Sequence, residues 1–589
     1  MVLWLKKHRR ITSLLYALIL AFLFCIPYLF RDLLPIGHDT FFHVSRIDGL
    51  AASIKDGDFL PAIYPYKNSG FGDGRPLFYC DVMLYPFALL DVIGVPVSIC
   101  YKLVIFVWTM LTAYTMSLCA ERITHSFQAG TIAAAAVLFA NYRITDVYVR
   151  GALGETQAFI FLPVLIEGLY IILYEKKTEQ WQLAAFGLAA LLMSHNLTFV
   201  LSCFLTMLLI TGSSQKLNPE TILACIKAIV AAFLLTVFFS LPMLEQLQSN
   251  RYYLNYYAET SDLSSGTLPL WKYFANQTVF GYSDNSLERN QQMLLNPGWF
   301  LTIAPLLWLY VRKKKPNAYI TLCLILGYVN LILPSSVIPW QSLDNLKVMQ
   351  FPWRLLESAV VLLAIPASAA IAFLFNQPEK IFTALILVCL CAEGIYHIYP
   401  VFHETFGMTS SMSWEDVTNG ALCDPAYSAT YMRVELAGGD YLPITSPDYR
   451  RLFPVIMDEN YKSLSTPYEK NSTRITFTLD EKNTDQTVVL PLTWYKGYTL
   501  YHMENGRWVK MSCHQDDHGL VSFYAKSSGK YKCVYLNTPL RNICIVISLV
   551  SWCFFLLSLL KRTRMKVSTT HGLKARGLAA GSSSTSVAR

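Results

Sequence analysis

Charged residues are scarce in this chain of 589 residues. Asp, Glu, Lys and Arg make up 15% of it, whereas a soluble domain averages about 25%. Hydrophobic residues make up 54% and the mean hydropathy is +0.37, which excludes an ordinary soluble enzyme and predicts a polytopic membrane protein. The net charge of +8 does not indicate nucleic-acid binding, because most of the excess lies in Lys and Arg clusters beside apolar runs, where such clusters act as topology signals.

Several familiar catalytic motifs are missing as well. No spacing matches a zinc site, a phosphate-binding glycine loop followed by Lys, or a nucleophile elbow, so nucleotide hydrolysis and serine-type hydrolysis have no support. The stretch from Gly70 to Gly74 is glycine-rich but follows no predicted strand. Most of the 14 cysteines lie inside apolar runs, where they behave as small hydrophobes. Cys513 and Cys533 flank strand-like sequence and either form a disulfide outside the cell or remain free thiols.

Long apolar runs are what the chain has instead, and they predict about 12 transmembrane helices. The predicted spans are residues 11–30, 96–118, 126–141, 157–174, 181–194, 197–213, 221–243, 298–312, 317–334, 353–375, 380–399 and 541–560. Several are short for a hydrocarbon core of about 30 Å. Lys and Arg fall in the connections that this count places in the cytoplasm, together with both chain termini. The first run is interpreted as an uncleaved anchor, because no small-residue cleavage pattern follows it.

The chain divides into four parts on this basis. Residues 1–399 form the transmembrane domain with its outer loops, 400–540 an extracytoplasmic β-rich domain, 541–565 the last span, and 566–589 a disordered cytoplasmic tail. In the second part, short runs of alternating hydrophobicity predict a β-sandwich-like fold. Asn505-Gly506 and Ser528-Gly529 are predicted to be hairpin turns.

An acid and two histidines follow the first predicted span. His38, Asp39 and His43 lie just outside the membrane on this topology, where a carboxylate meets both lipid-borne and water-borne substrates. Partial desolvation raises the pKa of Asp39 and improves it as a general base. The alternative is an ordinary loop residue, or the N-cap of a helix predicted over 44–55.

A second predicted outer loop, residues 141–156, contains Asp146, Arg150 and Glu155. Glu155 begins the fourth span, so one interpretation is that the helix N-terminus stabilises its charge. The other is that Glu155 faces Asp39 across a cavity and binds an acceptor or a metal. Arg150 is a candidate ligand for a phosphate group.

Polar residues at two further span boundaries are also candidates. His195 and Asn196 interrupt two short apolar runs, and polar groups at membrane depth usually face a cavity; a satisfied turn is the alternative. Arg354 enters a span and either binds phosphate through its fork-like guanidinium or snorkels to the interface. Trp353 fits an aromatic belt equally well. His38, Asp39, His43, Glu155 and His195 are of residue types that bind divalent metals, but sequence gives no geometry, so a metal cofactor stays undecided.

These motifs resemble those of the bacterial YfhO-like membrane proteins, which belong to the GT-C class of polytopic glycosyltransferases. The shared elements are Gly37-His38-Asp39, residues 74–79 with Arg75, residues 150–155, residues 350–354, and the β domain with residues 490–498 and 528–531. The resemblance implies a polyprenyl-phosphate-linked sugar donor that is used on the outer face of the bacterial plasma membrane. It implies an envelope glycopolymer such as lipoteichoic acid as acceptor.

The site expected from the sequence and the resemblance is that of an inverting glycosyltransferase. Asp39 is the base, and Glu155 or Asp146 occupies the place of a second acid. Arg354, Arg150 and Arg251 are expected to offset the charge on the leaving phosphate. The residues expected to bind substrate are His38, His43, Arg75, Asp146, His195, Asn196 and Trp353. The expected partners are the donor, the acceptor, membrane lipids and a glycosyltransferase on the cytoplasmic side that makes the donor.

Two other functions remain open at this stage. A transporter or flippase of a lipid-linked glycan predicts charges in the middle of spans and an internal repeat, and no convincing repeat is visible. A non-catalytic scaffold that binds envelope glycan through its β domain leaves Asp39 and Arg354 without a role.

Overall fold

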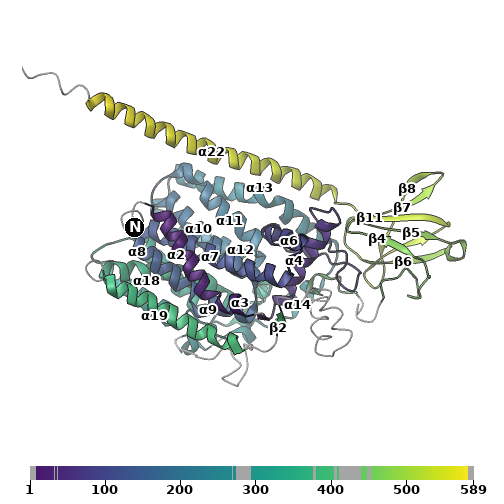
Figure 1. Cartoon of the computed structure of the whole chain (residues 1–589), viewed down its shortest axis with the longest axis horizontal. Coiled ribbons are helices and arrows are strands. Elements are labelled where there is room, and N and C mark those ends of the chain that lie inside the picture. The colour runs from purple at the N-terminus through teal and green to yellow at the C-terminus, as the bar shows by residue number, and fades with distance from the viewer. Residues whose placement is uncertain are drawn as a thin grey trace, which may run out of the picture.

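The computed structural model describes residues 8–31, 33–35, 37–267, 269–273, 293–375, 380–403, 407–409, 439–446 and 453–581. A body of packed helices has a small β domain at one end, and the last helix, α22, runs along the body from that end (Figure 1). Much of the predicted outer segment between the eleventh span and the β domain lies outside the described residues.

Helices occupy all twelve of the predicted apolar runs. Their bounds are α2 Arg9–Phe24 with α3 Ile26–Phe30, α7 Val97–Thr124, α8 Phe127–Leu138, α10 Leu153–Leu173, α11 Gln182–Ser194, α12 Asn196–Gly212, α13 Pro219–Ser249, α15 Trp299–Ile303 with α16 Trp308–Val311, α17 Ala318–Ile332, α18 Leu355–Leu374, α19 Lys380–Ile398 and α22 Pro539–Gly581.

The predicted count of 12 transmembrane helices is not confirmed. Among the described residues, six helices are long and apolar enough to cross a membrane. A seventh is added if α8 and the segment Asn141–Arg150, bent by 51° relative to each other, count as one span. A bilayer crossing needs about 20 residues, whereas α11, α12 and α17 have 13, 17 and 15. His195 is the reason for two of these short helices, because it ends α11 and caps α12.

Helices α10 and α18 form the centre of the body. Within their most apolar stretches, 89% and 94% of the residues are buried, against 28% for α19 and 17% for α22. Small residues let the central helices approach closely. A side chain at Gly168 of α10 would meet the backbone of Ala184 at 2.4 Å, and one at Gly187 of α11 would meet Leu165 at 2.7 Å. Groups at the N-terminal ends of α10 and α18 therefore lie deep inside the protein.

The second predicted outer loop is helical and buried, which corrects the sequence-based interpretation. It consists of α9 (Asn141–Ile144) and a π-helical turn (Thr145–Arg150), and every residue in both is buried. Gly151 ends the turn in a left-handed conformation (φ +61°). Ion pairs within the protein offset the free-energy cost of burying its polar residues. A hydropathy pattern does not reveal such ion pairs.

The first outer loop contains three short helices. The predicted helix at 44–55 is α4, Thr40–Lys55, and α5 (Arg75–Phe78) and α6 (Tyr85–Val92) follow it. A short strand, β1 (Leu33–Pro35), pairs antiparallel with β2 (Gly407–Thr409). A further short helix, α14, covers Tyr253–Thr260.

The predicted β-sandwich is present in the described part of the second domain. One antiparallel sheet has the order β3-β6-β10-β9 and the other β4-β5-β11-β7-β8. The strands are β3 Met457–Asp458, β4 Tyr468–Lys470, β5 Arg474–Leu479, β6 Gln486–Thr493, β7 Tyr498–Glu504, β8 Arg507–Met511, β9 His514–Gln515, β10 Leu520–Ala525 and β11 Gly529–Tyr535. Residues from both sheets, such as Leu490, Phe523 and Phe477, share one core.

One of the two predicted hairpins is confirmed and one is wrong. Asn505 and Gly506 both have positive φ and join β7 to β8 by a two-residue turn, as this dipeptide favours. Ser528 and Gly529 instead connect β10 in one sheet to β11 in the other. Cys513 and Cys533 are both free thiols.

The β domain is fixed to the first outer loop. The Thr493 amide donates to the Phe71 carbonyl at 2.8 Å, and the Thr493 hydroxyl donates to the Gly72 carbonyl at 3.0 Å. Lys470 Nζ donates to the Gly70 carbonyl at 2.5 Å. The domain continues into α22, which contains the last predicted span and extends into residues that the sequence predicted to be disordered.

Candidate active site

Asp39 is held against the π-helical turn by backbone contacts. The His38 amide donates to the Val149 carbonyl at 3.0 Å, and the Asp39 amide donates to the Arg150 carbonyl at 2.7 Å. This close approach requires glycine on both sides: a Cβ on Gly37 would lie 2.7 Å from the Gly151 nitrogen, and one on Gly151 would lie 2.5 Å from Thr40 Oγ1. Glycine is the residue that permits such contact and the left-handed φ of Gly151.

The carboxylate of Asp39 is not used for helix capping. Asp39 precedes α4, but its side chain makes no cap hydrogen bond, and it accepts none from any other described residue. It is half-buried. Burial raises the pKa of Asp39 above its ordinary value, although Arg150 and Arg354 partly oppose this. Asp39 thus occupies the N-cap position of α4, as the alternative expected, but without a capping hydrogen bond from its side chain. An accessible carboxylate with raised pKa suits a general base.

Glu155 is fully engaged with two arginines. Its Oε1 accepts from Arg150 Nη2 at 2.8 Å and from Arg354 Nε at 2.9 Å. Its Oε2 accepts from Arg150 Nη1 at 2.7 Å and from Tyr142 Oη at 2.9 Å. A carboxylate offers about four lone-pair sites, so this arrangement leaves none for an acceptor or a metal. Glu155 lies in the first turn of α10, where the helix N-terminus adds to its stabilisation.

Arg354 faces inward, so the snorkelling alternative is wrong. Besides Glu155, it donates through Nη1 to the Met349 carbonyl at 2.7 Å and to Gln350 Oε1 at 2.8 Å. The side chain is 7% exposed. Its Nη2 has no hydrogen-bond partner among the described residues, which leaves one donor direction of this guanidinium open.

Asp146 faces the interior rather than an acceptor. It accepts from Arg150 Nη1 at 3.0 Å and from the Thr156 hydroxyl at 3.2 Å. Nearby, Arg143 is completely buried, and none of its three guanidinium nitrogens has a hydrogen-bond partner within the described ranges. Its guanidinium lies 5.0 Å from the Phe159 ring centre, a cation–π contact.

Two of the three candidate histidines form hydrogen bonds inside the protein. His195 Nδ1 lies 2.9 Å from the Thr198 hydroxyl, which in turn donates to Glu357 Oε2 at 2.8 Å. Burial lowers the pKa of His195 to about 3, so its imidazole is neutral. His43 Nε2 accepts from the Leu153 amide at 3.2 Å and thereby joins α4 to α10. His38 is exposed beside Asp39.

Three other sequence candidates have supporting positions. Arg75 is fully buried, forms an ion pair with Asp73 and donates to the Phe42 carbonyl. Asn196 Nδ2 donates to the Phe78 carbonyl at 2.9 Å. Trp353 is buried and stacks on Phe351 with ring centres 4.3 Å apart, so it does not belong to a lipid-facing belt.

Arg251 makes no described contact with Asp39, Arg150, Glu155 or Arg354. It is exposed and forms an ion pair with Glu259. The expectation that it joins Arg150 and Arg354 at a phosphate is therefore not supported by their positions.

The structure adds residues that sequence reasoning missed. A side chain at Gly154 would collide with the Tyr79 hydroxyl at 1.7 Å and approach His195 Cδ2 at 3.1 Å, so Tyr79 and His195 both lie against the start of α10. Tyr441 stacks on Phe78 with ring centres 5.3 Å apart. Desolvation and the nearby charge of Asp39 raise the pKa of Asp440. Glu357 was missed as well. Only Tyr79 belonged to a recognisable motif.

A metal site is not formed by the expected residues. In the part of the chain that the structure describes, no three His, Cys, Asp or Glu side chains are grouped so that they can hold a metal ion. The expected set of His38, Asp39, His43, Glu155 and His195 is not such a group, because Glu155 and His43 are used in internal hydrogen bonds.

Comparison with known proteins gives distant similarities. No family model matches the chain. An uncharacterised protein of Lactococcus lactis subsp. cremoris is 21% identical over 588 residues, which cover 90% of this chain and 92% of that protein.

Three solved structures have partly similar folds. The arabinofuranosyltransferase AftD from Mycobacteria is 14% identical, with a TM-score of 0.46 over 71% of this chain and 28% of that chain. The Archaeoglobus fulgidus oligosaccharyltransferase is 11% identical in its apo form, with a TM-score of 0.45. The complex of an oligosaccharyltransferase from the same organism with an inhibitory peptide and a dolichol-phosphate is 10% identical, with a TM-score of 0.43. Both cover 79% of this chain, which spans 62% of theirs. Because each similarity is partial, the donor and acceptor of this chain have to be argued from its own residues.

Proposed function

We propose that this chain is a membrane glycosyltransferase that transfers a sugar from a polyprenyl-phosphate-linked donor to a hydroxyl group of an envelope glycopolymer. The observation that carries the proposal is the Asp39 carboxylate. It is half-buried, has no hydrogen-bond partner among the described residues, and is fixed by its backbone to Arg150. A structural carboxylate in such surroundings is normally paired, so an unpaired one indicates a functional role.

In the proposed reaction Asp39 accepts the proton of the acceptor hydroxyl. The hydroxyl oxygen forms a bond to the anomeric carbon, and the bond between that carbon and the phosphate oxygen breaks. The polyprenyl phosphate leaves with the bonding electrons, and the configuration at the anomeric carbon inverts. The raised pKa of Asp39 favours proton transfer near neutral pH.

Arg354 is proposed to stabilise the leaving phosphate through its open Nη2. Its other donors are fixed by Glu155, Met349 and Gln350, so the guanidinium is oriented before the donor binds. Preorganised donors of this kind stabilise developing charge without reorganisation. Glu155 is in this view a positioning residue for Arg354 and Arg150, rather than the second catalytic acid that the sequence suggested.

The acceptor is proposed to enter beside Tyr79, Tyr441 and Asp440. At the start of α4, Tyr79 lies against His43 and Tyr441 against Phe42, with ring centres 5.9 and 6.1 Å apart. Asp440 is near enough to Asp39 for the charge of Asp39 to raise the Asp440 pKa. A lipoteichoic-acid-like acceptor and a donor-making glycosyltransferase in the cytoplasm follow from the YfhO-like resemblance.

The outer face of the bacterial plasma membrane is the proposed location of the site, with both termini in the cytoplasm. In support, the start of α2 and the end of α22 both lie at the end of the body opposite the β domain (Figure 1).

The proposal is tested by sugar transfer in lipid nanodiscs. Purified full-length protein is given a radiolabelled polyprenyl-phosphate sugar and an envelope glycopolymer, and label in the polymer is counted. We expect Asp39→Asn to reduce transfer by about 10²–10⁴-fold, whereas Asp480→Asn, at a carboxylate that is 72% exposed, leaves it unchanged. Normal transfer by folded Asp39→Asn protein contradicts the proposal. Movement of the intact donor between leaflets without transfer supports a flippase instead.

A further inference from the structure

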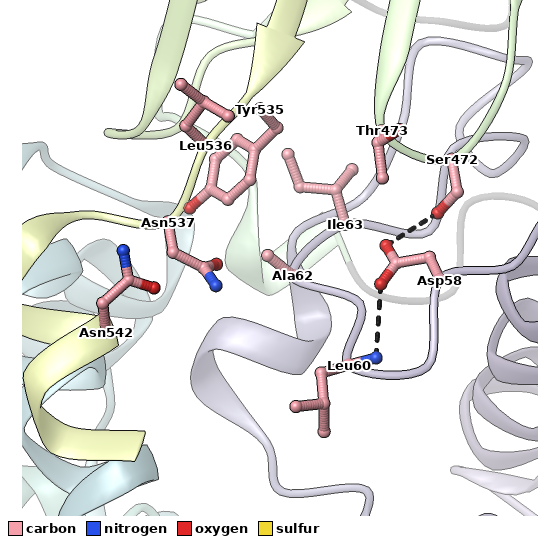
Figure 2. Close-up of a pocket in the computed structure, with 10 residues that line it drawn as sticks. All are labelled: Asp58, Leu60, Ala62, Ile63, Ser472, Thr473, Tyr535, Leu536, Asn537 and Asn542. Carbon is pink, nitrogen blue, oxygen red and sulfur yellow. Dashed lines mark hydrogen bonds between the residues drawn. The ribbon is translucent and has the colours of Figure 1, made fainter. Parts of the chain in front are cut away.

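A separate cavity lies where the first outer loop, the β domain and α22 meet. Its volume is about 380 Å³, within the range of small-molecule sites. Figure 2 shows its walls: the loop around Asp58, the turn between β4 and β5 at Ser472, and the end of β11 with the first turn of α22. The loop follows the C-terminal end of α4, and Asp39 precedes its start. A helix of 16 residues is about 24 Å long, so this cavity is distinct from the Asp39 site.

Uncharged polar side chains dominate one wall of the cavity. The amides of Asn537 and Asn542 point into it (Figure 2) and have no hydrogen-bond partner among the residues that the structure describes. Asp58 is fixed by the Ser472 hydroxyl at 3.0 Å and the Leu60 amide at 3.2 Å. The ring of Tyr535 forms part of the same wall. Amides that both donate and accept are suited to neighbouring hydroxyl groups of a ligand.

Exposed apolar residues surround the opening. Leu60 is 57% exposed and Leu536 44%, and the neighbouring Phe59 and Ile543 are 63% and 59% exposed. Asn542 lies in the first turn of the candidate span Pro539–Lys561, so the cavity is at the level where that span leaves the membrane. An exposed apolar rim at this level faces lipid rather than water.

Polar walls and an apolar rim together fit an amphiphile. The ten residues that line the cavity include the Asp58 carboxylate and no Lys or Arg, although Arg541 donates to the Leu60 carbonyl at 3.5 Å beside it. The two amides and the carboxylate favour a headgroup rich in hydroxyl groups. We infer that this cavity binds the uncharged saccharide headgroup of a membrane glycolipid, whose acyl chains lie along the apolar rim. If the proposed transferase function holds, this second site retains a lipid-anchored acceptor near the enzyme, but binding itself does not depend on Asp39.

Glycolipid retention tests the inference directly. Full-length protein in phosphatidylcholine nanodiscs is supplied with a diacylglycerol that carries two glucose residues, and bound lipid is measured by native mass spectrometry. We expect the double variant Asn537→Leu/Asn542→Leu to retain the glycolipid about tenfold more weakly, as loss of a few hydrogen bonds predicts. Asn460→Leu, at an exposed asparagine elsewhere in the β domain, is the matched control.

Three outcomes overturn the inference. Equal retention by the double variant shows that the cavity is not the site. Equal retention of phosphatidylglycerol shows that the cavity does not select a saccharide headgroup. Equally tight binding of the free disaccharide shows that the lipid part of the ligand is not required. If the double variant does not fold, Asn542→Leu alone suffices, because Asn542 is on the exposed side of α22. The Asp39→Asn protein is tested alongside, so that failure of the transferase proposal and failure of this one are distinguishable.

Discussion

Arg150 and Glu155 form a two-pronged ion pair across a left-handed turn. Arg150 Nη1 and Nη2 donate to Glu155 Oε2 and Oε1 at 2.7 and 2.8 Å, and Gly151 between them supplies the positive φ that reverses the chain. Arg354, 199 residues further along, adds a third hydrogen bond to the same carboxylate. The pair thus joins the π-helical turn, α10 and α18 into one rigid unit behind Asp39.

Glu155→Gln is expected to destabilise the protein strongly. The substitution removes the negative charge from between two buried guanidinium groups, and the loss of one partner of a buried pair costs about 3–5 kcal/mol. The measurement is thermal unfolding of detergent-solubilised protein. Glu121→Gln is the control, because Glu121 pairs with Arg9, which is 62% exposed, and such surface pairs contribute about 0–1 kcal/mol. Equal effects of the two substitutions would show that the buried pair has no special weight.

The pH dependence of transfer is expected to report Asp39. Because its pKa is raised by burial, the acid limb of the kcat/KM profile should lie above the ordinary Asp value of about 3.9. His195, with a pKa of about 3, adds no limb between pH 5 and 8. Asp39→Glu should keep a limb and Asp39→Asn should lose it. A limb of unchanged position in Asp39→Asn assigns the base to another group.

The same shift predicts the sign of a stability change. The folded protein binds the Asp39 proton more tightly than the unfolded chain does, so the free energy of unfolding falls as pH rises from the unfolded pKa to the folded one. Asp39→Asn removes this penalty. It should therefore be at least as stable as the wild type at pH 7, and the difference should vanish near pH 4. A variant less stable at pH 7 contradicts the assigned direction of the pKa shift.

Local signals in the sequence predicted much of the architecture. The twelve apolar runs all proved helical, period-two alternation predicted the sandwich, and Asn505-Gly506 predicted a correct hairpin. Asp39 was identified because it directly follows a span. Ser528-Gly529 misled, because a glycine turn between strands does not reveal whether the strands belong to one sheet.

The partners of each site residue were not predictable, because they depend on contacts between distant segments. Glu155 looked available from its position in the sequence, yet Arg354 and Arg150 occupy its carboxylate. Asp440 is about 400 residues from Asp39 and belongs to no periodic pattern. The number of spans is not confirmed, because apolar composition alone does not distinguish a crossing helix from a short buried one such as α11.

Docking of the β domain is expected to strengthen as pH rises above 7. Burial lowers the pKa of Lys470 to about 7, whereas an unfolded lysine titrates near 10.4. Between these values the unfolded chain binds more protons, so the free energy of unfolding rises with pH, by up to about 1.4 kcal/mol per unit. The free energy of unfolding of the wild type is measured by urea unfolding at several pH values from 7 to 9, with proteolysis of the β domain as the probe. Its change per pH unit is the slope.

The slope is assigned to Lys470 by substitution. Lys470→Met keeps an apolar chain of similar length without the buried charge, and it should flatten the dependence and stabilise the domain at pH 7. Lys482→Met, at a side chain that is 72% exposed, should keep the wild-type slope. An unchanged slope in Lys470→Met assigns the titration elsewhere.

Arg354→Lys is expected to impair donor binding more than proton transfer. Arg354 uses Nε for Glu155 and Nη1 for Met349 and Gln350, which leaves Nη2 for the phosphate. A lysine ammonium keeps the charge but not this planar set of directions, and a lost charge-assisted hydrogen bond of about 1.5–3 kcal/mol corresponds to a KM for the donor roughly 10–100-fold higher. The acid limb set by Asp39 should stay in place. Arg251→Lys is the control, since Arg251 is exposed and paired with Glu259, and its KM should be unchanged. Should Arg251→Lys raise the KM as Arg354→Lys does, the phosphate is bound nearer the surface than Arg354.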